Sequence, residues 1–263
     1  MPLFWHHFAG TLVLAQRLAF AVCRFLFWRC RACRARLVRW QRRARRQREE
    51  ALRTAAAIHG WTFESQDTGP WPLMRWQGSH EGTRWTLEYR RSRRTKHTRH
   101  GRAHRVVWWA DTFRGPSGPV VFLGVPAGQE NPFLKLAQSE GMLATMAQKA
   151  AGFALDQALD ARFGEEAGRQ VDAKLLKPVE DAHLPGFMVL AVDVPHAKWM
   201  LDDGWSKSMA ALAPEPGATG ATERPWVMVL PRRVLLARST PIRSPEDVQA
   251  VVREGMALVT AHG

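Results

Sequence analysis

Three carboxylates and one imidazole in a short stretch of the chain are of the types that carry out acid–base chemistry. Asp193, His196, Asp202 and Asp203 follow an apolar run that predicts a buried strand. A carboxylate beside a histidine can hold and pass a proton near neutral pH. No serine or cysteine nucleophile stands in an elbow-type motif nearby. The cluster is therefore compatible with an enzyme of unrecognised class, although Asp-Asp-Gly is also typical of a turn that ends a helix.

Two further groups have spacings that could hold a metal ion. His97, His100 and His104 could meet on one helical turn, but eight lysines and arginines surround them and would repel a cation. Cys30 and Cys33 form a C-x-x-C pair without the second pair of ligands that a structural zinc site needs. The chain also contains no G-x-G-x-x-G, P-loop or H-E-x-x-H motif. We therefore predict no metal ion, no cofactor and no catalytic residue, and consider an enzyme the less favoured class.

Arginine is the residue type that points to a binding function. The 263 residues carry a net charge of +14, and the excess is concentrated in residues 1–58 and 84–105. Clustered arginines bind lipid headgroups or phosphates, at about 1 kcal/mol per basic residue near an anionic membrane. The candidate anionic-lipid or phosphate-binding residues are Arg31, Arg34, Arg39, Arg42, Arg43, Arg45, Arg46, Arg93, Arg94 and Lys96.

The first of these arginine groups comes directly after an apolar run at residues 3–28. A run of this length can cross the roughly 30 Å hydrocarbon core, and the arginines behind it predict a cytoplasmic location for the remainder of the chain. Arg17 and Arg24 interrupt the run, so a helix lying in the interface and a buried soluble helix are alternatives. We expect residues 1–28 to be a membrane anchor, 29–58 a basic juxtamembrane helix and 59–263 a cytoplasmic domain.

The predicted domain at residues 59–263 alternates between strand and helix patterns. Residues 83–90 alternate apolar and polar side chains, which is typical of a strand with one wet face. Helical periodicity predicts helices at residues 131–163 and near 165–176, and Ser244-Pro-Glu-Asp is a helix-start signal for a C-terminal helix. The predicted fold class is α+β: an N-terminal membrane helix, then a mostly antiparallel sheet of about seven strands with an inserted helix pair and a C-terminal helix.

A set of glycine and tryptophan positions behind the apolar and basic N-terminus carries a family resemblance. It comprises Gly60-Trp61, Trp76-x-Gly78 and Gly82-x-x-Trp85-x-Leu87-x-Tyr89, with Leu201-Asp-Asp-Gly-Trp205 and the hairpin at residues 225–238 similar in placement. The chain resembles uncharacterised membrane-anchored bacterial proteins. That resemblance implies architecture and location, and it supplies no activity.

These patterns together predict a binding or assembly module rather than an enzyme. We expect a membrane-tethered cytoplasmic domain at the bacterial inner membrane, with its arginines on anionic lipid and with a membrane-protein partner or a second copy beside it. The alternatives are an enzyme using the Asp193, His196 and Asp202 cluster, and a nucleic-acid-binding protein using both basic regions. Nucleic acid is the less favoured partner because the first basic region adjoins an apolar run.

Overall fold

The structure, a computed structural model, describes most of the chain beyond residue 30. The described ranges are 31–66, 73–91, 104–111, 115–125, 142–180, 182, 184–216 and 222–260. They belong to two compact units, Met1–Ala51 and Leu52–Gly263. Helix α2 (Arg31–Ile58) forms the described part of the first unit and contributes its last turns to the second. Those last turns place Leu52 and Ala56 in the core of the second unit.

The membrane helix in our predicted fold class is wrong for the described part of the chain. Among the described residues, no helix combines the length and the apolar composition needed to cross a bilayer. Helix α2 is long enough, but ten of its 28 residues are arginine, and each arginine in a hydrocarbon core costs about 2.5–3.5 kcal/mol. Residues 3–28, to which the prediction of a span applied, lie outside the described residues.

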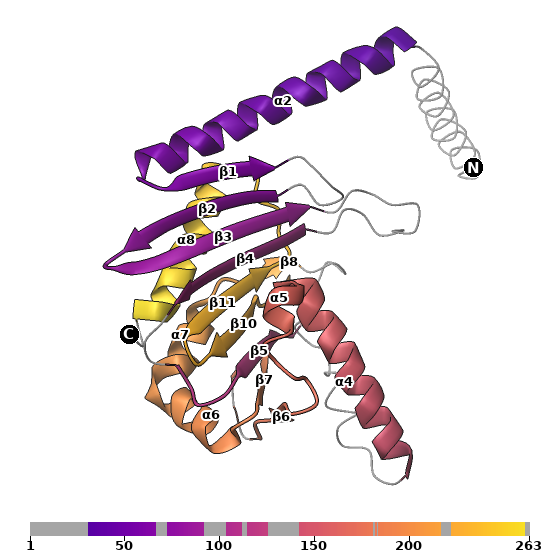
Figure 1. Ribbon diagram of the computed structural model, residues 1–263, viewed down its shortest axis with the longest axis vertical. Helices are drawn as coiled ribbons and strands as arrows, with labels where there is room; N and C mark the ends of the chain where they lie inside the picture. Colours follow the sequence, from indigo (N-terminus) through magenta and orange to yellow (C-terminus); the bar gives the residue numbers. More distant parts are fainter. Residues whose placement is uncertain are drawn as a thin grey trace, which may run out of the picture. The chain divides into compact units, whose positions relative to one another are not determined.

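Nine strands form one antiparallel sheet in the described part of the second unit, where the sequence indicated about seven (Figure 1). In spatial order they are β1 (Thr62–Gln66), β2 (Leu73–His80), β3 (Thr83–Arg91), β4 (His104–Asp111), β11 (Arg233–Arg238), β10 (Trp226–Leu230), β5 (Val120–Gly124), β7 (Phe187–Ala191) and β6 (Lys177–Pro178). Every neighbouring pair is antiparallel. A separate small ladder pairs β8 (Glu215–Pro216) with β9 (Thr222–Glu223).

The turn between β2 and β3 is short. Strand β2 continues to His80, and the turn contains only Glu81 and Gly82. Both turn residues have positive φ angles, 50° and 80°. This is the geometry of a two-residue hairpin whose twist matches that of its strands.

Side chains alternate between two hydrophobic clusters on the two faces of the sheet. On β4, Trp108 and Ala110 enter the first cluster while Val107 enters the second. Strands β5, β7, β10 and β11 divide in the same way and are buried on both faces. Strands β1 to β3 contribute only to the first cluster. Their second face is therefore the polar one.

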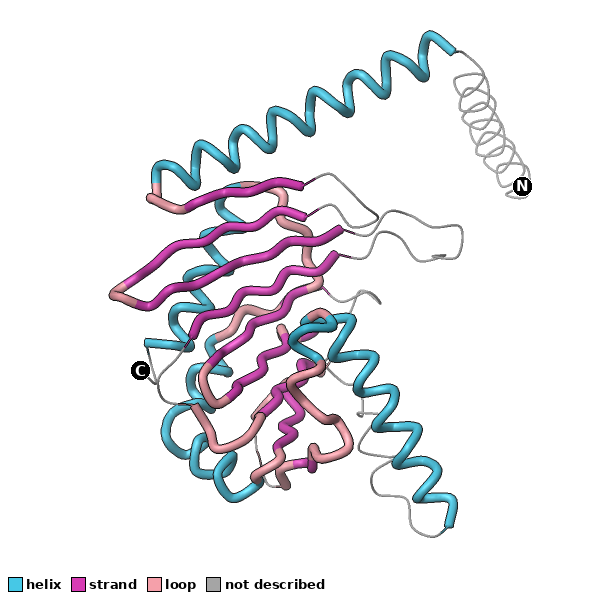
Figure 2. Tube along the Cα trace, viewed as in Figure 1, coloured by secondary structure: helices cyan, strands magenta, loops and turns pink. Residues whose placement is uncertain are grey.

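Helices lie on both sides of the sheet (Figures 1 and 2). The first cluster is closed by α6 (Val194–Met200), the short wide turn η1 (Leu201–Trp205), α7 (Ser206–Ala211) and α8 (Pro245–Thr260). The second cluster is closed by α4 (Met142–Phe163) and α5 (Glu165–Gly168). The second inserted helix is thus four residues long rather than the twelve that residues 165–176 suggested.

Helix α8 begins where the sequence indicated and packs closely against β4. The Asp247 carboxylate accepts hydrogen bonds from the backbone N–H groups of Arg243 and Ser244, at 2.6 and 2.9 Å, which closes the first turn. Further along the helix, Gly255 faces Trp108, and a Cβ atom at that position would collide with the indole ring. A glycine in the helix interior is therefore required by packing.

Two glycine-to-alanine substitutions in helices should change stability in opposite directions. Alanine is favoured over glycine in a helix by about 0.8–1.0 kcal/mol. At Gly152 in α4 the nearest neighbour of an added Cβ is Lys174 Cγ at 3.7 Å, so Gly152→Ala should stabilise by about that amount. Gly255→Ala should instead destabilise by about 1–3 kcal/mol because its methyl group overpacks Trp108. Urea unfolding of both variants would test this, and a stabilising Gly255→Ala would contradict the packing.

Candidate functional site

Helix α2 holds most of the predicted anion-binding residues. Arg39, Arg42, Arg43, Arg45 and Arg46 are exposed to solvent. Arg31 and Arg34 lie on the same helix, and Arg93, Arg94 and Lys96 lie outside the described residues. The structure thus brings the predicted arginines of residues 31–46 onto one continuous helix of about 42 Å, at 1.5 Å per residue.

A narrow apolar stripe runs along this helix among the arginines. Leu37, Trp40, Ala44 and Ala51 fall within about 60° of one another at 100° per residue. All four are exposed, and Trp40 has 65% of its surface accessible. The rest of the helix surface between residues 35 and 47 is arginine, glutamine, Ala35 and Val38. The surface of this helix is therefore mainly cationic, and Trp40 and Leu37 are its most exposed large apolar side chains between residues 35 and 47.

Asp193 and His196 lie together at the start of helix α6. Asp193 caps helix α6: its carboxylate accepts the backbone N–H of His196 at 3.1 Å and the Ser117 hydroxyl at 2.8 Å. These two bonds, the backbone bond first, hold the pKa of Asp193 below its ordinary value. The imidazole of His196 packs against the indole of Trp199, 5.4 Å between ring centroids. The carboxylate and the imidazole are thus each engaged in local structure.

The other two carboxylates of the cluster lie apart from it. Asp202 and Asp203 are exposed on η1, where Gly204 has a φ of 104° and the helical path kinks. A 440 Å³ cavity beside this turn is lined by Asp203, Lys207 and Glu254 among others, without Asp193 or His196. Convergence of the cluster on one cavity, which the enzymatic alternative requires, is not seen among the described residues.

Of the three predicted histidines, His104 lies within the described residues. His104 begins β4, and its Nδ1 lies 2.8 Å from the Tyr89 hydroxyl. Its ring also stacks on the Tyr89 ring at 5.9 Å. His97 and His100 lie outside the described residues. Within the described ranges, no three histidine, cysteine, aspartate or glutamate side chains are placed to share a metal ion.

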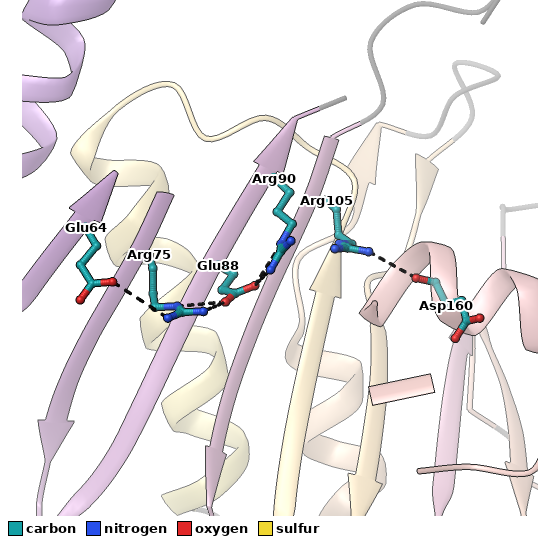
Figure 3. Close-up of polar contacts among 6 residues, drawn as sticks. All are labelled: Glu64, Arg75, Glu88, Arg90, Arg105 and Asp160. Atoms are coloured by element: carbon teal, nitrogen blue, oxygen red, sulfur yellow. Dashed lines mark hydrogen bonds and ion pairs between the residues drawn. The ribbon is translucent and has the colours of Figure 1, made fainter. Parts of the chain in front are cut away.

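A row of charged side chains crosses the polar face of β1 to β4 and was not predicted from the sequence (Figure 3). Arg75 bonds Glu88 Oε1 through Nε at 2.9 Å and through Nη2 at 2.5 Å, and it lies 4.0 Å from Glu64. Arg90 bonds the other oxygen of Glu88, at 3.2 Å. Glu88 therefore divides its single negative charge between two guanidinium groups. The polar alternation of β3 was visible in the sequence, but the partners on β1, β2 and β4 depend on strand register.

Arg105 ends this row and caps helix α4. Its Nη1 donates to the Asp160 carbonyl at 3.4 Å, at the helix end where cations are favoured. Gly164 makes this approach possible: its φ is 94°, and a Cβ atom there would lie 3.3 Å from Nη1. Burial, and then the charge of Arg90, lower the pKa of Arg105. Among the described residues no carboxylate forms an ion pair with its guanidinium.

A groove of about 910 Å³ opens beside Arg105, between the polar face of the sheet and the ends of α4 and α5. Its apolar lining residues include Val107, Trp109 and Leu235. The sheet side carries mostly arginines, with Glu88 among them, and the helix side carries mostly acidic residues, with Arg169 among them. The groove-lining residues with charge are Arg75, Glu88, Arg90, Arg105, Asp160, Glu165, Glu166, Arg169 and Arg233.

Comparisons of the chain with protein-family models, with curated proteins and with solved structures found no match. The resemblance to membrane-anchored bacterial proteins therefore stays a prediction from the glycine and tryptophan positions.

Removing the Asp193 carboxylate should affect folding in a pH-dependent way. Its pKa is lower in the folded state than the unfolded value near 3.9. The stabilisation is therefore present above about pH 4 and is lost as the pH falls through the lowered value. Asp193→Ala should lower the unfolding temperature at pH 7, and the difference from the parent should narrow below about pH 4.

Thermal unfolding followed by circular dichroism between neutral and acidic pH would measure this effect. Asp202→Ala is the matched control, because Asp202 is an exposed carboxylate only a few residues away. An equal loss of stability in Asp202→Ala would show that the cap is not the cause.

Proposed function

We propose that this protein is a non-enzymatic binding module that uses helix α2 to contact an anionic lipid surface. The observation that carries the proposal is the exposed row of arginines on a single uninterrupted helix. Ten arginines and two glutamates give α2 a net charge of +8 over 28 residues. Such a helix is attracted to an anionic bilayer by about 1 kcal/mol for each basic residue near the surface.

The apolar stripe favours lipid over nucleic acid as the partner. Trp40 and Leu37 are exposed side by side on the helix surface. An indole sits well at the headgroup level of a bilayer, where its ring is partly in the apolar layer and its N–H remains wet. Against the phosphate backbone of a nucleic acid, electrostatic contact alone would suffice and the exposed apolar stripe would have no partner.

The apolar stripe is narrow, which predicts shallow and salt-sensitive attachment. Helices that lie deeply in the interface usually bury a wide apolar face. Here most of the circumference is cationic, so electrostatic attraction should dominate. Salt screens this attraction beyond a Debye length of about 8–10 Å at physiological ionic strength, so added salt should weaken binding. The enzymatic alternative has no supporting site among the described residues, and turnover of any substrate by the protein would count against our proposal.

Neutralising four arginines of α2 should weaken vesicle binding strongly. The variant is Arg39→Gln, Arg42→Gln, Arg43→Gln and Arg46→Gln in the full chain, which keeps good helix formers in place. Its partition onto vesicles of phosphatidylcholine with phosphatidylserine should fall by up to about 1,000-fold at low salt, at about 1 kcal/mol per residue. Cosedimentation would measure this partition. Pure phosphatidylcholine vesicles, which carry no net charge, would separate electrostatic binding from any apolar attachment.

A charge-matched control distinguishes the helix from net charge. Arg84→Gln, Arg232→Gln, Arg243→Gln and Arg253→Gln remove four exposed arginines from the second unit. That variant should bind vesicles nearly as the parent does. Equal losses in the two variants would reject α2 as the contact surface. Tight binding to duplex DNA with none to anionic vesicles would support the nucleic-acid alternative instead.

A further inference from the structure

The groove beside Arg105 brings two arginines together on neighbouring strands. Arg90 on β3 stands directly opposite Arg105 on β4 in the strand register. Like charges directly opposite one another in an antiparallel pair are destabilising. Both side chains line the groove. A negatively charged group between them would remove the repulsion.

The carboxylates near Arg90 and Arg105 offset this repulsion only in part. Glu88 contacts Arg90 at 3.2 Å, but its other oxygen is engaged by Arg75. Glu165, across the groove on α5, contacts Arg169 at 3.4 Å. The Asp160 backbone carbonyl is the hydrogen-bond acceptor that Arg105 meets within the described ranges. A guanidinium has five N–H donors in a planar fork, so Arg105 retains donors for a ligand.

The opposite wall of the groove limits how far the negative charge of a ligand can extend. Asp160, Glu165 and Glu166 line the helix side together with Arg169, and the excess of carboxylates there would repel a ligand with negative charge along its whole length. A polyanion such as a nucleic-acid strand is therefore disfavoured here. A ligand with one anionic group can place it on the arginine side and keep the rest of its body away from the acidic wall.

The apolar lining and the volume indicate what the rest of that ligand would be. Val107, Trp109 and Leu235 line the groove, and Trp109 is the most exposed of the three because Val107 and Leu235 are almost fully buried. A volume of about 910 Å³ is within the range of small-molecule sites, which are mainly apolar with a few placed polar groups. The groove thus places apolar side chains beside two guanidinium groups.

We propose that this groove binds a small organic anion, with its carboxylate or phosphate between the Arg90 and Arg105 guanidinium groups and its apolar body on Val107, Trp109 and Leu235. This site is separate from the α2 surface, and its occupant is a soluble small molecule rather than a membrane. Carboxylate and phosphate both match the planar fork of an arginine. The two chemistries are distinguished by the probes below.

Calorimetric titration of the full chain with 3-phenylpropionate and with phenyl phosphate tests the proposal. Each probe joins an aromatic ring to one of the two anionic groups, and benzyl alcohol and inorganic phosphate lack one half of the pair. At least one aromatic anion should bind more tightly than both half-probes. The affinity for that aromatic anion should fall about tenfold or more in Arg90→Gln and in Arg105→Gln, because each variant loses a charged hydrogen-bonding partner.

Arg84→Gln is the matched control, because Arg84 is exposed on the same face of β3 and does not line the groove. Its affinity should remain within about twofold of the parent value. Arg105→Gln removes the charge but keeps an amide donor for the Asp160 carbonyl, whereas Arg105→Lys keeps the charge. Binding that is retained in the lysine variant but lost in the glutamine variant would identify charge as the cause.

Two results would overturn the proposal. One is the absence of binding by either aromatic anion to the parent protein up to about 10 mM. The other is binding that neither Arg90→Gln nor Arg105→Gln weakens while circular dichroism shows both variants folded. Vesicle binding should be unchanged in Arg105→Gln, so failure at the groove and failure at α2 can be told apart.

Discussion

The requirement to cover both faces of a wide sheet organises the second unit of this protein. Helices α6, α7 and α8 close the first face, while α4 and α5 close the second face only from β4 onwards. Strands β1 to β3 therefore carry apolar side chains toward one face and charged or polar ones toward the other, with Trp85, Leu87 and Tyr89 inward and Glu88 outward. The charged row and the groove both arise where the cover of the second face ends. The candidate binding site thus exists because the helices cover only part of the second face of the sheet.

Local patterns in the sequence predicted those features that neighbouring residues determine. The alternation of residues 83–90 and the helix start at Ser244 depend on periodicity and capping within a few residues, and both are present in the structure. The order of the strands was beyond such patterns, because β11 inserts between β4 and β10 through pairing between distant segments. The predicted membrane helix has no counterpart among the described residues, where the long helix α2 carries ten arginines in 28 residues.

The candidate sites show the same division between local and distant determinants. The arginines of α2 could be found by counting, since a helix without glycine or proline displays them wherever it lies. The Arg90 and Arg105 pair could not be found in this way, because only the register of β3 against β4 places them opposite one another. The nearness of Asp193 and His196 has a local structural explanation. An aspartate three residues before a backbone N–H caps a helix, and this local bond requires nothing of the imidazole.

The β4–β11 pairing has a consequence for the protein during its synthesis. Asp111 and Arg233, which meet across this pairing, are 122 residues apart in the chain. At about 5–20 residues per second, a ribosome takes about 6–24 s to make the intervening segment. Throughout that time the nascent meander β1 to β4 presents β4 as an open edge, and an open edge is a template for pairing with another chain. Yield in the cell should therefore depend on translation speed and on chaperones that shield this edge.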